Sequence, residues 1–297
     1  MRIVVAGSSG FLGTALRDRL AREGHEVLRL VRGAASTPTE SSWDPYTGRV
    51  DDRLVASADA VINLAGAPLI RWPWTASYRR SILDSRVATT RTLAEAIART
   101  GGGTALVNGS GIDAYADTGR ARCDESSPFG TTFLAGVVRE WEAATTPAAD
   151  AGARVVRLRT GAVLHASGGA LRLIKIPFLL GVGGRAGSGS QWFPIISRDD
   201  WVGAVVFVLT RPDASGPFNL VTPESVTNAE FARALGEVLH RPSVVPVPAV
   251  PVRLVAGEMS RQLLGSVGAV PAALTRAGFA FEHPDVRSTL QAAFDRR

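Results

Sequence analysis

The sequence is poor in the residues that build disulfides and metal sites, and it has no long apolar run. Its only cysteine, Cys123, excludes an internal disulfide and a cysteine-rich metal site. The four histidines lie far apart without the spacing of metal ligands, so we expect no metal (His25, His165, His240 and His283). No apolar run reaches the length of a membrane span, and the chain begins on a predicted strand without a signal-peptide pattern. We therefore expect a cytoplasmic protein with no membrane partner.

Lysine is nearly absent as well, since Lys175 is the only one, and the net charge of +6 comes from arginine. The arginines are spread along the chain and alternate with acids, as in Arg17-Asp18-Arg19, which is typical of solvated helix faces. We expect no nucleic-acid partner, because no basic tract is present. With 45% hydrophobic and 20% charged residues, the 297-residue chain can bury one large core and a smaller annex.

The first 33 residues contain a complete strand, glycine turn, helix and second strand. An apolar run at 2–6 predicts a strand, an amphipathic stretch at about 11–23 predicts a helix, and 26–31 predicts the second strand. Between the first strand and the helix lie Gly7, Gly10 and Gly13, in the pattern G-x-x-G-x-x-G. Such a turn lets backbone N–H groups and the positive end of the helix dipole face the phosphates of a dinucleotide.

The residue that closes the second strand indicates which dinucleotide binds. An NAD site has an Asp or Glu here to accept hydrogen bonds from the ribose 2′-hydroxyl, whereas this chain has Arg32 and no carboxylate. A guanidinium pairs well with the oxygens of a 2′-phosphate. We therefore expect NADP(H) rather than NAD(H) as the cofactor.

Strands and helices alternate along the next part of the chain. This spacing predicts an α/β fold, a Rossmann-type doubly wound parallel sheet with a small, mostly helical C-terminal substrate lobe. Residues 1–165 are expected to form the NADP-binding domain, with 195–222 returning to it, and 166–194 and 223–297 the C-terminal lobe. Further strands are expected at 41–44, 59–66, 105–108, 154–158 and 218–220, and helices at 76–99, 131–150 and 197–209.

Several motifs together resemble one enzyme family. Besides the glycine turn they are Asn63-Leu64-Ala65-Gly66, Arg71-Trp72 through Ser85-Arg86, Gly187 through Pro194, Thr227 through Phe231 and Gly278 through Phe281. The chain resembles the extended short-chain dehydrogenase/reductases, the NAD(P)-dependent epimerase/dehydratase family. More narrowly, it is similar to the atypical "epimerase family" subgroup that carries a C-terminal domain of unknown function.

The resemblance implies a cofactor cleft and a substrate pocket between the two lobes. The cofactor cleft would be lined by Gly7, Ser9, Gly10, Phe11, Leu12, Gly13, Arg32, Leu64, Ala65, Arg86 and Arg159. A glycine-rich segment that ends in Gln191, Trp192 and Phe193 has the composition of a substrate-facing wall rather than a linker.

The wider family uses a Tyr-x-x-x-Lys pair, in which the lysine lowers the pKa of the tyrosine so that the phenol can exchange a proton with the substrate. No tyrosine of this chain is followed by lysine four positions later: Tyr46, Tyr78 and Tyr115 are followed by Val50, Ile82 and Gly119. Phe133 and Val137 occupy the two expected positions, which places Phe133 among the substrate-site candidates. Neither of these side chains can titrate.

Three functions stay open on this sequence. The chain could be an NADPH-dependent oxidoreductase acting on a carbonyl or sugar-like small molecule, with Ser110 orienting the substrate oxygen and Tyr115 or water giving the proton. An unassisted tyrosine is protonated at neutral pH, which favours reduction over oxidation. Alternatively, it is a sugar-nucleotide epimerase, or a sensor that binds NADP(H) without turnover. We expect a monomer or homodimer.

Overall fold

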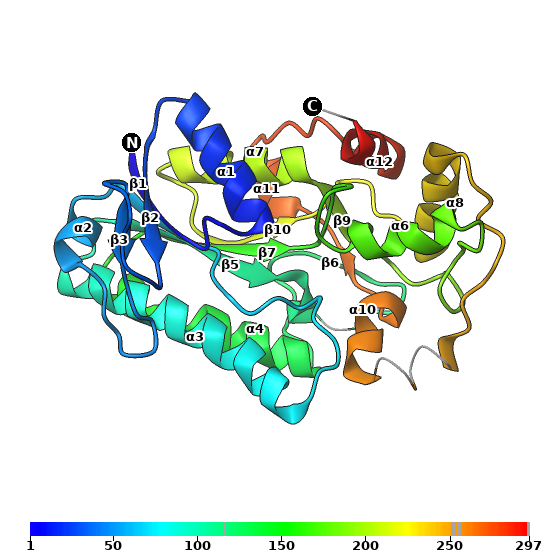
Figure 1. The fold of residues 1–297 in the computed structure, drawn as a ribbon, viewed down its shortest axis with the longest axis horizontal. Helices are drawn as coiled ribbons and strands as arrows, with labels where there is room; N and C mark the ends of the chain where they lie inside the picture. The colour runs from blue at the N-terminus through cyan, green and yellow to red at the C-terminus, as the bar shows by residue number, and fades with distance from the viewer. Residues whose placement is uncertain (116, 251–253, 255–256, 296–297) are drawn as a thin grey trace.

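The computed structural model describes residues 1–115, 117–250, 254 and 257–295. Its centre is a seven-stranded parallel sheet in the order β10-β7-β5-β4-β1-β2-β3 (Figure 1). The strands are β1 (Arg2–Ala6), β2 (Glu26–Val31), β3 (Glu40–Ser42), β4 (Ala60–Asn63), β5 (Ala105–Gly111), β7 (Val155–Thr160) and β10 (Gly216–Leu220). The chain order reverses direction between β1 and β4, which is where open parallel sheets bind ligands.

The central strands are buried on both faces, because alternate side chains enter two separate apolar cores. Ile3 and Val5 of β1 point into one core, and Val4 and Ala6 into the other. The register continues this division across the sheet, as Ile62 of β4 is paired with Val5. The near-continuous hydrophobic runs that predicted strands therefore reflect burial on two sides.

Helices cover both faces of the sheet. Figure 1 shows α1 (Phe11–Arg22) and α7 (Arg198–Thr210) on one side, and α3 (Ala76–Arg99) and α4 (Phe133–Ala143) on the other. The shorter α2 (Asp52–Ala56) and α5 (Thr146–Asp150) pack beside α3. A 3₁₀ turn, η1 (Ile112–Tyr115), follows β5 directly. The predicted doubly wound α/β fold is confirmed.

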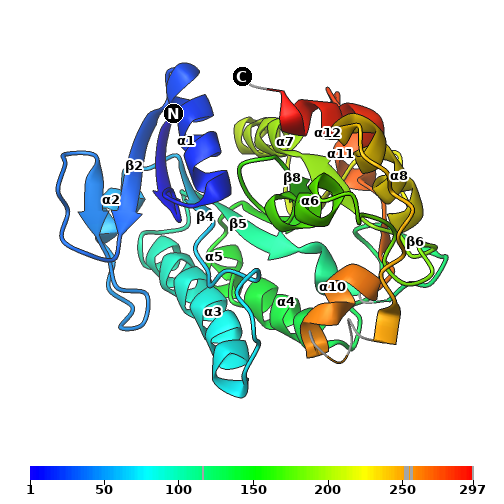
Figure 2. The same cartoon turned by 45° about the vertical axis from the view of Figure 1, so that its right-hand side comes forward.

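Most of the remaining elements lie together beyond one end of the sheet (Figures 1 and 2). A third apolar core joins α6 (Leu171–Leu179), α8 (Asn228–Leu239) and α12 (Val286–Phe294) with the strand pair β8 (Ala162–Leu164) and β9 (Ile195–Ser197). A second pair is formed by β6 (Arg122–Cys123) and β11 (Gly268–Ala269). The short elements η2 (Gly257–Ser260) and α10 (Arg261–Leu264) complete this region, whereas α11 (Ala272–Arg276) packs against β10 of the sheet. The sequence also contains a proline-rich segment at 242–251, and its last residue, 251, lies outside the described residues.

The structure corrects one predicted helix. Residues 131–150 do not form a single helix, because α4 ends at Ala143 and α5 begins at Thr146. Pro147 stands in the first turn of α5. Proline lacks an N–H, and its ring clashes with the carbonyl four residues earlier, so a helix cannot run through this position without a break. Proline in the first turn is tolerated, which explains why a new helix starts here.

Helix α1 lies close against the turn after β1 because position 13 has no side chain. A Cβ at Gly13 would lie 2.1 Å from the carbonyl oxygen of Gly7 and 2.9 Å from the Cα of Ser8. Both atoms belong to the backbone, so neither can rotate away. The third glycine of the motif therefore sets the distance between α1 and the glycine turn.

Gly13→Ala is expected to lower the free energy of unfolding by about 1–3 kcal/mol, because the added methyl group forces the helix away from the turn. The matched control is Gly136→Ala in α4, where a Cβ would meet no atom within 4 Å. That control should raise stability by about 0.5–1 kcal/mol through the better helix propensity of alanine. Urea unfolding of both variants checks this, and equal effects of the two substitutions would contradict it.

Candidate cofactor cleft and buried polar network

The glycine turn leaves β1 in a conformation that requires glycine. Gly7 has a φ of +82°, and a Cβ there would lie 2.6 Å from the carbonyl carbon of Leu64. The turn closes when the N–H of Gly10 donates to the carbonyl of Gly7 at 3.1 Å. Gly10 is the N-cap of α1 and has no side chain to cap it. The first N–H groups of the helix are thus left for an anion.

A cavity of about 760 Å³ opens at this turn, along the carboxyl edge of β1, β2 and β4. Six of the residues predicted for the cofactor line it: Gly7, Ser9, Gly10, Arg32, Leu64 and Ala65. The same walls also contain residues that the sequence did not single out for this site, among them Arg29, Glu40, Trp43, Tyr46 and Arg71. The cavity is thus large enough for a ligand that extends from the glycine turn past the end of β2.

Two of the remaining predicted cofactor residues act behind the cavity wall. Arg86 packs against Gly66, where a Cβ would lie 3.3 Å from its Cγ, and its Nη1 donates to the carbonyl of Ala67 at 3.1 Å. Burial lowers the pKa of Arg86 to about 10. Phe11, at the start of α1, packs its ring against Gly168. Both side chains therefore support the shape of the cleft, and neither is among the residues that line the cavity.

Asn63 holds the end of β4 in place. Its Nδ2 donates to Thr90 and to Asn108, both at 2.9 Å, and its Oδ1 accepts the N–H of Ala65 at 3.2 Å. The side chain is completely buried, so these bonds replace those it would make with water. This amide therefore fixes the backbone of Leu64 and Ala65 where it faces the glycine turn.

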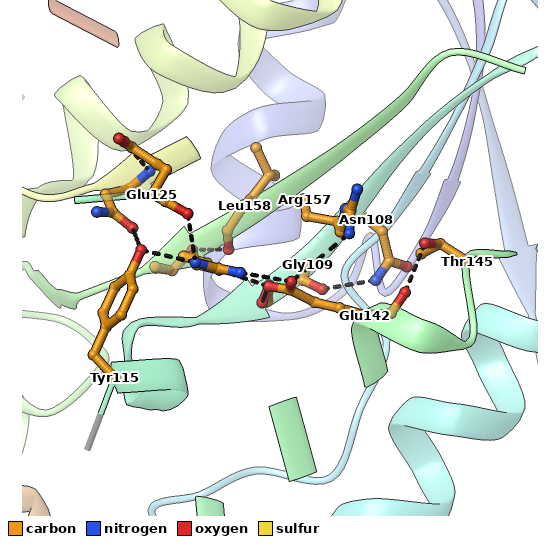
Figure 3. Close-up of polar contacts among 12 residues, drawn as sticks. Asn108, Gly109, Tyr115, Glu125, Glu142, Thr145, Arg157 and Leu158 are labelled. Atoms are coloured by element: carbon orange, nitrogen blue, oxygen red, sulfur yellow. Dashed lines mark hydrogen bonds and ion pairs between the residues drawn. The ribbon is translucent and has the colours of Figure 1, made fainter. Parts of the chain in front are cut away.

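Ser110, predicted to orient the substrate oxygen, and Tyr115, predicted to give the proton, are both buried in one polar network. Figure 3 shows the part of this network around Tyr115 and Glu142. The Ser110 hydroxyl donates to Oε1 of Glu142 at 2.6 Å. The Tyr115 hydroxyl donates to Oδ1 of Asn219 at 2.7 Å and accepts from Nη1 of Arg159 at 2.9 Å. The structure brings the two residues together through Arg159, but neither is among those that line the 760 Å³ cavity.

Arg159 is the centre of this network and does not line the cofactor cavity. Its Nε and Nη2 donate to the two carboxylate oxygens of Glu142, at 2.8 and 2.9 Å, and Nη1 also donates to the carbonyl of Glu125 at 3.3 Å. Burial by itself would lower the pKa of Arg159, but the bonds and charge of Glu142 outweigh it and raise the pKa. Arg159 is therefore charged throughout the physiological pH range.

The same environment acts on the phenol of Tyr115. Burial raises its pKa to about 12, although the neighbouring Arg159 cation opposes this effect. A phenol with this pKa is protonated at neutral pH and cannot serve as a base. In the wider family the neighbouring lysine has the opposite effect, because it lowers the pKa of the tyrosine.

The four predicted substrate residues occupy different places. Phe193 packs in the C-terminal core with its ring 4.8 Å from that of Phe231. Trp192 donates its Nε1 to the carbonyl of Arg120 at 3.2 Å, and Gln191 donates to the carbonyl of Ala186 at 2.9 Å.

Phe133 lies apart from them, in the apolar cluster around Ile82. The structure thus does not bring these four side chains to one pocket wall.

Glu142 and Glu125, which organise the polar network, were not predicted from the sequence, although the position of Glu142 could have indicated its role. Glu142 is an acid on the buried side of an otherwise amphipathic helix, directly after a tryptophan, and such a position needs a cationic partner. Glu125 gave no local signal, because its carboxylate binds the N–H groups of Asn219 and Ala273, far away in the chain. Pairing over 94 and 148 residues is visible only in the fold.

Comparison with known proteins identifies the class. The model of the NAD dependent epimerase/dehydratase family matches residues 3–161, and a domain of unknown function, DUF1731, matches 247–293. The chain belongs to the NAD dependent epimerase/dehydratase family. This confirms the resemblance seen in the sequence, including the C-terminal domain of unknown function.

Similar proteins of the subgroup place the chain more narrowly. It is 42% identical over 289 residues to an epimerase family protein of Mycobacterium tuberculosis, covering 97% of this chain and 96% of the relative. It is 36% identical over 298 residues to the human epimerase family protein SDR39U1, covering 98% and 99%. The crystal structure of the human protein (isoform 2) with NADPH superimposes with a TM-score of 0.89 at 34% identity, covering 99% of both chains.

A second solved structure is a nucleoside-diphosphate sugar epimerase from Corynebacterium glutamicum, with a TM-score of 0.81 and 33% identity. The match covers 99% of this chain and 58% of that protein. In the part of the chain that the structure describes, no helix combines the length and hydrophobicity needed to cross a bilayer.

Breaking the buried ion pair should be costly. Glu142→Gln is expected to lower the free energy of unfolding by about 3–5 kcal/mol, because the Arg159 charge is left buried without its partner. The matched control is Glu237→Gln, since Glu237 pairs with Arg287 at the surface with both side chains largely exposed. That change should cost under about 1 kcal/mol. Chemical denaturation measures both, and a Glu142→Gln loss as small as that of the control would contradict the role given to the pair.

Proposed function

We propose that this protein binds NADP(H) in the 760 Å³ cavity and reduces a carbonyl group of a small molecule. The observation that carries the proposal is the fit of the cavity to a dinucleotide: a glycine turn with no bulky side chain, an uncapped helix N-terminus and an arginine all line one cleft. The human relative whose structure contains NADPH covers 99% of the chain, which supports the same cofactor.

Residues of this chain can be assigned to the parts of the cofactor. Gly7, Ser9 and Gly10, with the N-terminus of α1, would hold the diphosphate, since they offer backbone donors and no bulky side chain. Arg32 is exposed at the end of β2 and would pair with the 2′-phosphate. When bound, NADPH supplies a hydride for reduction of a carbonyl carbon.

The direction of the reaction follows from Tyr115. Reduction requires a proton for the substrate oxygen, and Tyr115 keeps its proton at neutral pH because burial raises its pKa to about 12. Arg159, 2.9 Å from the phenol oxygen, would stabilise the negative charge left after proton donation. Water is the alternative donor. Oxidation and epimerisation need a base, and neither Phe133 nor Val137 can supply one.

A second function, an NADP(H) sensor without turnover, is favoured by one specific observation. The hydroxyls of Ser110 and Tyr115 are buried and already donate to Glu142 and Asn219. To act on a substrate, either group would have to exchange a protein partner for the ligand. A sensor would need no such exchange.

Arg32→Ala should weaken NADPH binding about 10- to 100-fold, the loss expected for a charge-assisted hydrogen bond, and leave NADH binding within about twofold. Arg22→Ala on the exposed side of α1 is the control and should alter neither affinity. Calorimetric titration with both nucleotides measures the effect. Equal weakening for NADPH and NADH would contradict the assignment of Arg32 to the 2′-phosphate.

If Tyr115 gives the proton, Tyr115→Phe should reduce NADPH-dependent turnover of an active carbonyl compound about 10²- to 10⁴-fold. The wild-type rate should stay level between about pH 6 and 9, because a donor with a pKa of about 12 loses its proton only as the pH approaches that value. A stopped-flow screen of aldehydes and ketones with NADPH tests both points. Tight NADPH binding without turnover across the screen would favour the sensor.

A further inference from the structure

Besides Arg32, the residues that line the cavity include a second arginine and a carboxylate from neighbouring strands. Arg29 belongs to β2 and Glu40 to β3, and both line the cavity. We propose that Arg29 is a second ligand for the 2′-phosphate of NADP(H) and that Glu40 positions it. The proposal rests on the proposed NADP(H) binding and names a further residue that determines cofactor specificity.

The pairing of the two strands brings the side chains together. Arg29 and Glu40 are partners in the parallel register of β2 and β3, and Nη2 of Arg29 donates to Oε1 of Glu40 at 2.6 Å. The Arg29 side chain is 25% exposed and that of Glu40 only 9%, so the arginine is the more accessible side chain of the pair. This geometry holds the guanidinium at the cavity wall with one side tied to the protein.

Glu40 does not replace the acid that an NAD site places at the end of the second strand. Its Oε2 already accepts the N–H of Ser36 at 2.7 Å and the Ser36 hydroxyl at 2.6 Å, in addition to the Oε1 bond from Arg29. A carboxylate has about four acceptor positions, so three are filled by the protein. The bonds from Ser36, together with Arg29, hold the pKa of Glu40 below its usual range, and the group stays ionised. Glu40 is thus a positioning residue.

Arg29 keeps donors for a ligand after it has bound Glu40. A guanidinium has five N–H donors in a planar fork. Among the described residues, the bond to Glu40 is the one hydrogen bond that the Arg29 side chain makes. A phosphate with close to two negative charges needs more than the single charge of Arg32 for full compensation. Arg29 and Arg32 both line this cavity, so they provide two guanidinium groups for the phosphate.

The experiment compares Arg29→Gln with Arg22→Gln, a matched substitution on the exposed side of α1. Binding is titrated with two pairs of ligands, NADPH with NADH and adenosine 2′,5′-bisphosphate with 5′-AMP. In each pair only the first ligand carries the 2′-phosphate. Arg29→Gln should weaken both 2′-phosphate ligands about tenfold and leave NADH and 5′-AMP within about twofold. Unchanged NADH binding also shows that the variant is folded.

Two variants of Glu40 separate positioning from a general structural role. Glu40→Ala should lower the affinity for NADPH relative to that for NADH, as Arg29→Gln does. Glu40→Gln should keep the affinity for NADPH, relative to that for NADH, at the wild-type value or above it, because the amide oxygen still accepts a hydrogen bond from Arg29. If Arg29→Gln changes NADPH and NADH binding equally, or neither, the role of Arg29 is overturned while NADP(H) binding stands. If the wild-type chain does not bind NADPH, both proposals are overturned.

Discussion

The buried ion pair between Glu142 and Arg159 is the interaction on which the centre of this structure depends. Two charges that have left water must be surrounded by partners, and three neighbouring elements contribute to this network of bonds. β5 contributes Ser110, η1 contributes Tyr115, and β10 contributes Asn219, whose amide also donates to the carbonyl of Val270. Through the carboxylate of Glu125 the same set of bonds reaches α11. The pair therefore joins the carboxyl edge of the sheet to the C-terminal part of the chain.

This arrangement explains how the fold tolerates the loss of the usual titrating pair. Phe133 and Val137 lie on α4 in an apolar cluster with Ile82, so that part of the helix contributes packing and no proton chemistry. Polar groups are gathered one turn further along the helix, where Glu142 faces β7. Tyr115, in the same network as Glu142, stays protonated at neutral pH because burial raises its pKa to about 12.

The cofactor cleft was largely predictable because its determinants are local. The turn from Gly7 to Gly13 lies within seven residues, and its strand, helix and φ requirements can all be derived from residue types. Arg32 was predictable for the same reason, since it closes the second strand of the unit. The contact between Arg29 and Glu40 could not be predicted, because residue types alone do not tell which side chain on β2 lies beside which side chain on β3. Their contact depends on the register of two paired strands.

The sequence by itself determined the α/β fold, the position of the dinucleotide turn and the absence of a Tyr-x-x-x-Lys pair. Periodicity, glycine spacing and composition act over short segments, and a single chain displays them directly. Only the tertiary structure decided that Arg159 belongs to Glu142 rather than to the cofactor cavity, and that Ser110 and Tyr115 meet around this pair. Those contacts join residues 17 to 44 positions apart, and the Tyr115–Asn219 bond spans 104. The cost of burying a charge selects such partners, and it arises only when the elements have packed together.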